Sequence, residues 1–548
     1  MIHFVTNVPF GGILGEVVGK TTILITGALH EAAMAAFNGT DAFEIIYRPD
    51  CSREELLSLV PRCQVLVSRS ETDVDKVVMD AAHQLKVIAR AAVGVGNIDI
   101  PYATEKGILV INTPGKNTNS AAEMTLALLL AMMRHIPEAY HKVREGGWDR
   151  HAFTGRELKG KTIGIVGVGN VGHRVAKFCK SFDMEVIAFD PYISTSVFQR
   201  LNITRIESLE DLASRCDILS VHVPLNKETK GMVHRGILNL MKKGSWIVNA
   251  ARGGIILEKD ILEALESGHI AGAAIDTWET EPKPSLALVS HPKVYGAPHI
   301  GASTEEAQLA IGETIYEQVV KAIDGGVVDY PVNLPQVGII ESPLLRPYAI
   351  LAEKLGAMAA QILDFNPSRV MIAYRGDLAG LDHSLVRLSF MKGYASRVVD
   401  GFVSFVNAGQ HFEKLGLTLE EDADPGFDSY RSALKIKIFG SGGKNIAIGG
   451  IVFDSKYPRI SLVNDYYFEI EPQGTFLLVE NDDKPGVIGA LGTFLASKAI
   501  NIDSFDLARN RKGGQAMAMI RVDTPPLDSD MNLMIKLPNV RGVKLLQL

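Results

Sequence analysis

The sequence predicts an α/β protein in which parallel sheets occupy the larger N-terminal part and smaller α+β units follow. Two observations predict this fold class. Short runs rich in Val, Ile and Ala alternate with helical patterns from Thr22 onward, as expected of strands covered by helices on both faces. The alternation stops at residues 330–335, where two prolines mark a boundary. At about 150 residues per domain, the 548 residues predict three to four domains.

Composition narrows the class of protein. Hydrophobic residues make up 47% of the chain and charged residues 22%, which excludes a mainly disordered chain. The net charge of −7 argues against a nucleic-acid partner, because proteins that bind phosphate backbones usually carry a basic surplus. Four cysteines without CxxC spacing predict no disulfide framework and no metal site, and they favour a reducing compartment. The chain shows no signal-peptide pattern and no bilayer-spanning apolar run, so we expect a cytoplasmic protein with no membrane partner.

The first α/β run begins after about 20 residues that fit no element. Its apolar segments predict a helix at 30–37 and strands at 22–28, 63–70, 85–91 and 107–114. A long helical stretch follows at 120–146. This stretch is too apolar for a one-sided surface helix, so we expect it to be buried between lobes or subunits.

The second run predicts a doubly wound parallel sheet. Its expected strands lie at 162–169, 185–190, 217–224, 245–251, 271–278 and 294–300. Helical patterns separate several of these strands, as at 257–268. An amphipathic helix at 305–326 ends at a glycine pair and closes the run.

The segment GVGNVG places Gly167, Gly169 and Gly172 between a strand pattern and a helical pattern. The first glycine permits a tight turn, the second lets the backbone approach a pyrophosphate, and the third allows close packing of helix on strand. The helix N-terminus then offers free N–H groups to phosphates. Asp190 ends the next strand, where a carboxylate accepts ribose hydroxyls and repels a 2′-phosphate, which favours NAD over NADP. A structural glycine turn beside an unrelated Asp is the alternative.

Three further residues lie at or near strand ends of the same run, namely Arg252, Glu281 and His299. Residues at the carboxyl ends of parallel strands gather around a shared crevice. A guanidinium can grip a carboxylate, a histidine can accept the proton of a hydroxyl, and a carboxylate can stabilise the protonated imidazole. These side chains therefore suit the oxidation of a 2-hydroxy acid, although spacing alone leaves open whether they converge.

Residues 22–335 resemble the D-isomer-specific 2-hydroxyacid dehydrogenase family. The resemblance rests on GVGNVG with Asp190 and on the segments HVPLNKETKGMV (222–233), NAARGG (249–254), AAIDTWETEP (273–282) and APHIGAST (297–304). It implies that Arg252, Glu281 and His299 are the catalytic trio, and that Asp276 lies near the nicotinamide amide. The other cofactor contacts that it implies are Asn170, Val171, His222, Pro224, Ala250 and Gly301. It also implies a two-lobed Rossmann-type dehydrogenase with a discontinuous substrate lobe, and a dimer interface at 120–146.

Within that family, four stretches resemble the phosphoglycerate dehydrogenases, at 67–70, 90–99, 112–123 and 145–167. The resemblance implies substrate contacts from two arginines, one amide and a backbone cradle, which are Arg69, Arg90, Asn117, Gly94 and Val95. A phosphate suits paired arginines, because guanidinium groups present donors in a fixed fork. Solvated strand-end arginines are the alternative. The loop departs from the family pattern at Ala92 and Gly96, which leaves room for another 2-hydroxy acid.

The C-terminal segment at 479–502 resembles an ACT domain, a βαββαβ sensor of amino acids, with DKPG beginning its first helix. Asn481, Asp483 and Asn501 match ligand-holding positions, and paired ACT domains would bind serine at their interface. The alternative for Asp483 and Asn501 is a helix cap and a turn residue.

The patterns and the resemblances together imply a plan of four domains. These are a substrate lobe (1–112 and 310–335), an NAD-binding Rossmann domain (113–309), an intervening α+β domain (336–472) and the ACT-like domain (473–548). The expected activity is NAD-dependent oxidation of D-3-phosphoglycerate to 3-phosphohydroxypyruvate in serine synthesis, with serine as a possible effector and a homodimer or homotetramer as the assembly. Two alternatives stay open. One is an NADH-dependent reductase of hydroxypyruvate, glyoxylate or 2-oxoglutarate. The other is a non-catalytic regulatory protein gated by NAD.

Overall fold

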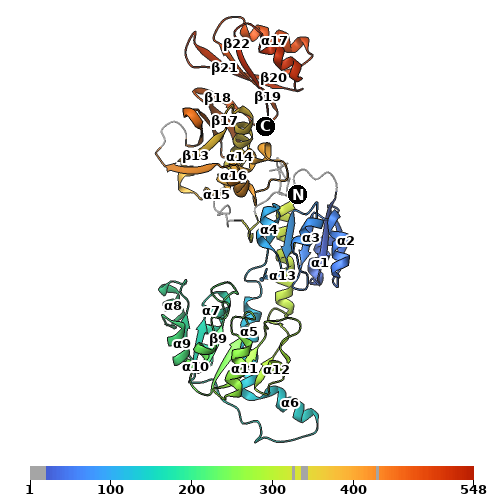
Figure 1. Ribbon diagram of the computed structural model, residues 1–548, viewed down its shortest axis with the longest axis vertical. Helices are drawn as coiled ribbons and strands as arrows, with labels where there is room; N and C mark the ends of the chain where they lie inside the picture. The colour runs from blue at the N-terminus through green and yellow to red at the C-terminus, as the bar shows by residue number, and fades with distance from the viewer. Residues whose placement is uncertain (1–19, 324–327, 335–343, 427–430) are drawn as a thin grey trace.

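The computed structural model describes residues 20–323, 328–334, 344–426 and 431–548. The first 19 residues, for which the sequence predicts no element, lie outside these ranges. So does the expected end of the substrate lobe at residue 335. Figure 1 shows an elongated molecule in which the N-terminal lobe and the intervening domain lie between the Rossmann sheet at one end and the C-terminal domain at the other.

The first sheet is parallel and has the strand order β2-β1-β3-β4-β5. Its strands are β1 (Thr21–Thr26), β2 (Phe43–Tyr47), β3 (Val65–Ser68), β4 (Val87–Arg90) and β5 (Leu109–Ile111). Every residue of β1, β3, β4 and β5 is buried, which explains why their apolar residues are consecutive, at 23–25, 65–67, 87–89 and 109–111, instead of alternating with polar ones. Helix α13 (Glu305–Ile323) returns to this lobe and packs Ile311, Ile315 and Val319 into its core.

The second sheet has seven parallel strands in the order β12-β11-β10-β9-β6-β7-β8. Its strands are β6 (Thr162–Val166), β7 (Glu185–Phe189), β8 (Thr204–Arg205), β9 (Ile218–Val221), β10 (Ser245–Asn249), β11 (Ile270–Ile275) and β12 (Val294–Gly296). Six of them match the expected strands, and β8 was not expected. The strand order reverses between β6 and β9, so a crevice opens beyond the carboxyl ends of these strands.

The predicted single helix at 120–146 is wrong, because the structure has two helices there. Helix α5 (Thr118–Arg134) ends at His135, whose φ of 53° is left-handed, and α6 (Ile136–Arg144) starts anew with Pro137 in its first turn. A proline cannot continue a helix from the preceding turn, since it lacks an N–H and its ring clashes with the earlier carbonyl. Helix α5 packs Leu126, Leu129 and Met132 into the core of the second sheet, rather than between lobes, whereas no residue of α6 is buried within this chain.

The intervening domain is a six-stranded mixed sheet in the order β14-β13-β15-β16-β17-β18. Its strands are β13 (Pro367–Gly376), β14 (Thr418–Asp424), β15 (Ser432–Gly440), β16 (Asn445–Phe453), β17 (Tyr457–Val463) and β18 (Tyr466–Ile470). Helices α14 (Leu345–Ile362) and α15 (Ser384–Val398) pack against each other, and their buried residues share one core with the sheet.

The C-terminal domain is a four-stranded antiparallel sheet in the order β20-β21-β19-β22. Its elements alternate as βαββαβ: β19 (Thr475–Asp482), α17 (Val487–Ser497), β20 (Ile502–Arg509), β21 (Gln515–Val522), α18 (Asp528–Met534) and β22 (Val540–Gln547). Helix α17 begins one residue after DKPG rather than within it, because Gly486 has a left-handed φ of 97° and forms the cap. The predicted order of elements is otherwise observed.

Candidate active site

The glycine turn between β6 and α7 (Asn170–Ser181) has the geometry of a phosphate cradle. Gly167 has a φ of 90°, and a Cβ atom on Gly172 would lie 2.0 Å from the Gly167 carbonyl oxygen, so neither position accepts a larger residue. A Cβ on Gly169 would meet no atom within 4 Å, and no side chain caps the helix that starts beside it. The N–H groups at Asn170 and Val171 are therefore presented to open space, where a pyrophosphate fits.

Asp190 and His222 flank this turn. One Asp190 carboxylate oxygen accepts the Val168 N–H at 2.8 Å, which ties the end of β7 to the glycine turn. His222 Nε2 lies 2.8 Å from the Ser220 hydroxyl, while its Nδ1 is buried and has no hydrogen-bond partner among the described residues. Desolvation lowers the pKa of His222 to about 4, so the ring is neutral at physiological pH. The donor set, the open cradle and the orphaned nitrogen fit a dinucleotide.

His299 and Glu281 form a hydrogen-bonded pair, with 2.8 Å between His299 Nδ1 and Glu281 Oε2. The other Glu281 oxygen accepts the Trp278 N–H at 3.0 Å. Burial tends to raise the pKa of Glu281, but the hydrogen bonds from His299 and Trp278 hold it below its usual value. Glu281 is therefore ionised and accepts the Nδ1 proton, which leaves Nε2 of His299 unprotonated when the ring is neutral.

A buried carboxylate holds the loop that carries His299. His299 has a left-handed φ of 55°, which is unfavourable for a residue with a Cβ. The two oxygens of the fully buried Asp276 accept the N–H groups of Ile300 at 2.9 Å and Gly301 at 2.8 Å. Asp276, for which the family resemblance implies a place near the nicotinamide amide, thus also anchors this loop.

Arg252 lies at the contact between the two lobes. A Cβ on Gly94 would lie 2.8 Å from Nη2 of Arg252, so the guanidinium lies directly against the loop of the first lobe. Its Nη1 donates to the Ala251 carbonyl at 2.6 Å. Burial lowers the pKa of Arg252, and the charge of Glu281 opposes that shift. The trio predicted from sequence is therefore gathered at the contact between lobes.

Of the substrate residues predicted from sequence, Arg90 and Gly94 lie at this same contact. Arg90 is 3% exposed, and its guanidinium donates to the carbonyl oxygens of Gly94, at 3.0 Å, and of Arg69. Burial lowers the pKa of Arg90 to about 10. Val95 lies in the loop that Arg90 holds, and Asn117 precedes the first turn of α5. The structure thus gives Arg90 a loop-holding geometry, while Arg69 keeps more of its guanidinium exposed.

Sequence reasoning missed Asn249 and Gln308. Asn249 is 3% exposed; its amide donates to the Arg252 carbonyl at 2.9 Å and accepts the Ala251 N–H at 3.1 Å, so it shapes the arginine turn. Gln308, in the first turn of α13, contacts Arg69. Asn249 sits inside the NAARGG segment and could have been found there. Nothing local distinguishes Gln308 from an ordinary helix residue.

The three regulatory residues predicted in the C-terminal domain are not gathered within one chain. Asn481 and Asp483 lie at the end of β19 near Gln515, whereas Asn501 precedes β20 at the opposite end of the sheet and donates to Asp523 at 2.8 Å. Asp483 accepts the Gly513 N–H at 2.8 Å.

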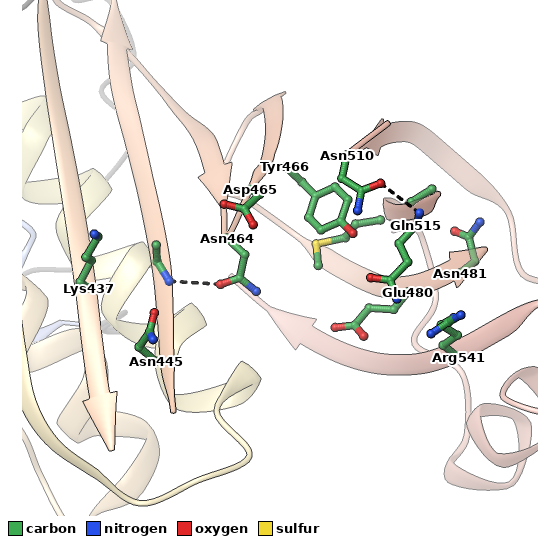
Figure 2. Close-up of a pocket in the computed structure, with 13 residues that line it drawn as sticks. Lys437, Asn445, Asn464, Asp465, Tyr466, Glu480, Asn481, Asn510, Gln515 and Arg541 are labelled. Atoms are coloured by element: carbon green, nitrogen blue, oxygen red, sulfur yellow. Dashed lines mark hydrogen bonds between the residues drawn. The ribbon is translucent and has the colours of Figure 1, made fainter. Parts of the chain in front are cut away.

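A polar pocket of about 450 Å³ lies between the intervening and C-terminal domains, and Asn481 lines it (Figure 2). Lys437 and Asn464 come from the intervening domain, and Glu480 and Arg541 come from the C-terminal domain. The Asn481 side-chain oxygen is buried and lacks a hydrogen-bond partner among the described residues. Within the part of the chain that the structure describes, none of the helices has the length and hydropathy of a membrane span.

Comparison with known proteins identifies the families that the domains of this chain match. The family model of the D-isomer specific 2-hydroxyacid dehydrogenase NAD binding domain matches residues 126–301. The D-3-phosphoglycerate dehydrogenase intervening domain matches residues 344–464, and the ACT domain matches residues 475–539. The fold and site therefore define an NAD-dependent 2-hydroxyacid dehydrogenase with an ACT domain, which confirms the predicted class and cofactor.

Full-length relatives define the family more closely. D-3-phosphoglycerate dehydrogenase of Methanocaldococcus jannaschii is 37% identical over 96% of this chain and 99% of that protein. The enzyme of the same name from Bacillus subtilis is 34% identical over 96% of this chain and 99% of that protein. The chain belongs to the D-3-phosphoglycerate dehydrogenase family.

Solved structures of dehydrogenases match somewhat more than half of the chain. D-lactate dehydrogenase from Aquifex aeolicus, complexed with NAD and lactic acid, is 25% identical with a TM-score of 0.51, covering 57% of this chain and 98% of that one. A glyoxylate reductase from Paecilomyes thermophila is 27% identical with a TM-score of 0.52 and the same coverage.

Proposed function

We propose that this protein oxidises D-3-phosphoglycerate to 3-phosphohydroxypyruvate with NAD, at the entry to serine synthesis. The observation that carries the proposal is the His299–Glu281 pair, whose carboxylate interacts with the charge of Arg252, together with the contact of Arg252 with the Gly94 loop of the first lobe, the lobe that also carries Arg69. A base, a carboxylate anchor and a second guanidinium suit a phosphorylated 2-hydroxy acid. The full-length relatives support the same substrate.

His299 is the base of this reaction. Because Nδ1 is held by Glu281, Nε2 is the atom that accepts the substrate hydroxyl proton. The charge that forms on the imidazole is stabilised by Glu281 at 2.8 Å. When bound at the glycine turn, NAD supplies the acceptor for the hydride that leaves C2.

Arg252 and the Gly94 loop orient the substrate. The Arg252 Nη2 edge lies at the lobe contact, where it can bind the α-carboxylate and polarise the C2 oxygen. Asp276 keeps the His299 loop in its left-handed conformation, so the base does not have to reorganise during the reaction. Arg69 is assigned to the phosphate.

The test is NADH oxidation with 3-phosphohydroxypyruvate, compared with hydroxypyruvate, glyoxylate and 2-oxoglutarate. We expect a strong preference for the phosphorylated substrate and loss of turnover in His299→Ala. Equal or better rates with an unphosphorylated acid would favour the alternative reductase, which the departures at Ala92 and Gly96 allow. Undetectable turnover despite NAD binding would favour a regulatory protein.

We also propose that serine binds the ACT domain and lowers the rate. Asn481 and Asp483 lie together, but Asn501 is at the far end of the same sheet, so all three can share a ligand only if Asn501 comes from a second copy. A homo-oligomer agrees with the exposed apolar stripe Ile136, Tyr140 and Val143 on α6. The proposed compartment is the cytoplasm. Serine titration that leaves both rate and NAD affinity unchanged would contradict this regulation.

A further inference from the structure

One glutamine side chain connects the phosphate-side arginine to the catalytic loop. The Gln308 Nε2 group donates to the carbonyl oxygen of Ala302 at 2.8 Å, and its Oε1 accepts from Nη1 of Arg69 at 2.6 Å. Ala302 follows His299 by three residues, in the loop that Asp276 anchors. A single amide therefore connects Arg69 to the loop that carries the general base.

The orientation of this amide follows from chemistry. A guanidinium has only donors and a backbone carbonyl has only an acceptor, so a flipped amide would place donor against donor at Arg69 and acceptor against acceptor at Ala302. Only a side chain of this length that carries both a donor and an acceptor can bond to the Arg69 guanidinium and to the Ala302 carbonyl. Leucine satisfies neither, and glutamate repels the Ala302 carbonyl.

The contacts of Arg69 leave one edge of its guanidinium for a ligand. Nη1 donates to Gln308 and to the Ala28 carbonyl at 2.6 Å, which uses both of its protons. The side chain lies across Gly27, where a Cβ would be 2.8 Å from both Cβ and Cγ of Arg69. Nε and Nη2 make no hydrogen bond to the described residues. That remaining edge has the two-donor geometry that binds a phosphate in bidentate fashion.

We propose that Gln308 is a positioning residue that sets specificity for a phosphorylated substrate by holding the free edge of Arg69 at a fixed distance from His299. The inference rests on the proposed function, because it assumes that Arg69 binds the phosphate. It assigns Gln308 no contact with the reacting atoms. Its effect therefore falls on phosphate binding rather than on proton transfer.

The test measures kcat and KM of Gln308→Leu with 3-phosphohydroxypyruvate and with hydroxypyruvate. Loss of a hydrogen bond to a charged group predicts a fall of about 10- to 100-fold in kcat/KM for the phosphorylated substrate, mainly through KM. The value for hydroxypyruvate should fall less than about threefold. Glu313→Leu, an exposed position on the same helix, is the matched control and should behave as wild type.

A double-mutant cycle separates positioning from general damage. In an Arg69→Met background, Gln308→Leu should lower kcat/KM for the phosphorylated substrate little further, because the arginine through which Gln308 acts has been removed. Equal losses on both substrates with a reduced kcat, or additive losses in the cycle, would overturn the role of Gln308. A wild-type enzyme without preference for the phosphorylated substrate would contradict the proposed function instead, so the two failures are distinguishable.

Discussion

The hydroxyl of Ser404 donates a 2.8 Å hydrogen bond to the carbonyl oxygen of Gly107, which joins the intervening domain to the first lobe. Asn407 shapes this contact from a position that is 1% exposed, accepting the Ser404 N–H at 2.8 Å and donating to the Phe402 carbonyl at 3.0 Å. Val406 packs into the core of the first sheet. The intervening domain thus packs against the lobe that carries Arg69 and Arg90.

Asn407→Ala should weaken the contact between the intervening domain and the first lobe. The buried Ser404 N–H and the Phe402 carbonyl lose their hydrogen bonds, which costs about 1–3 kcal/mol of local stability. We expect faster amide exchange at 402–408 and at Gly107, while the Rossmann domain is unchanged. Asn445→Ala, at an exposed position, is the control. Unaltered exchange in Asn407→Ala would show that Val406 and its neighbours hold the contact alone.

Glu281→Gln should strongly impair catalysis although it preserves size. The glutamine amide can donate to Nδ1 and so favour the tautomer with the proton on Nε2, which cannot accept the hydroxyl proton. We expect a loss of at least about 10-fold in kcat, compared with about 10²–10⁴-fold for His299→Ala. Glu279→Gln makes the same change at an exposed side chain that bonds to Glu258. A Glu281→Gln enzyme as active as this control would mean that the pair is structural.

Gly169→Ala and Gly172→Ala should fail for different reasons. A Cβ at Gly169 meets no protein atom, so the variant should fold normally and bind NAD at least about 10-fold more weakly, because the methyl occupies the phosphate cradle. A Cβ at Gly172 collides with the Gly167 carbonyl, so this variant should lose stability. Calorimetry of NAD binding and thermal melting separate the two effects. Normal NAD affinity in Gly169→Ala would contradict the assigned site.

Gly96→Asp restores the carboxylate that the family pattern has at this position, and it tests whether the altered loop has changed the substrate. A Cβ at Gly96 meets nothing within 4 Å, so the change should alter stability by less than about 1 kcal/mol. Because the arginine edge rather than this turn is assigned to the phosphate, we expect the preference for 3-phosphohydroxypyruvate to stay within about threefold. A preference that rises tenfold or more would show that Gly96 had redirected the site.

His222 should make stability depend on pH. Its pKa is about 4 in the folded protein against about 6.5 for a free histidine, so the unfolded chain binds the extra proton between these values. The stabilising contribution is complete above pH 6.5 and is lost as the pH falls toward 4. The slope attributable to this group is at most about 1.4 kcal/mol per pH unit. Denaturant titrations at pH 7, 6 and 5 should show this slope in the wild type and a shallower one in His222→Asn; equal slopes would contradict it.

Much of the fold was predictable because its signals are local. β1 and β6 each contain a run of consecutive buried residues without a polar side chain, at 23–25 and 163–166, and a helical pattern follows each of them. The glycine turn carries its own conformational requirement at Gly167. The break at His135 was missed even though Pro137 signals it, because the apolar content on both sides suggested one helix.

The sequence by itself determined the class of fold, the βαββαβ order of the last domain, and which side chains could do acid–base and phosphate chemistry. Tertiary structure alone decided which of them meet. Arg252 contacts Gly94, and Gln308 contacts Arg69, which is 239 positions away in the sequence. Asn481 and Asn501 lie at opposite ends of the C-terminal sheet. The physical reason is that strand ends and helix starts are brought together by packing of whole elements, and no local pattern in the chain encodes the distances that result.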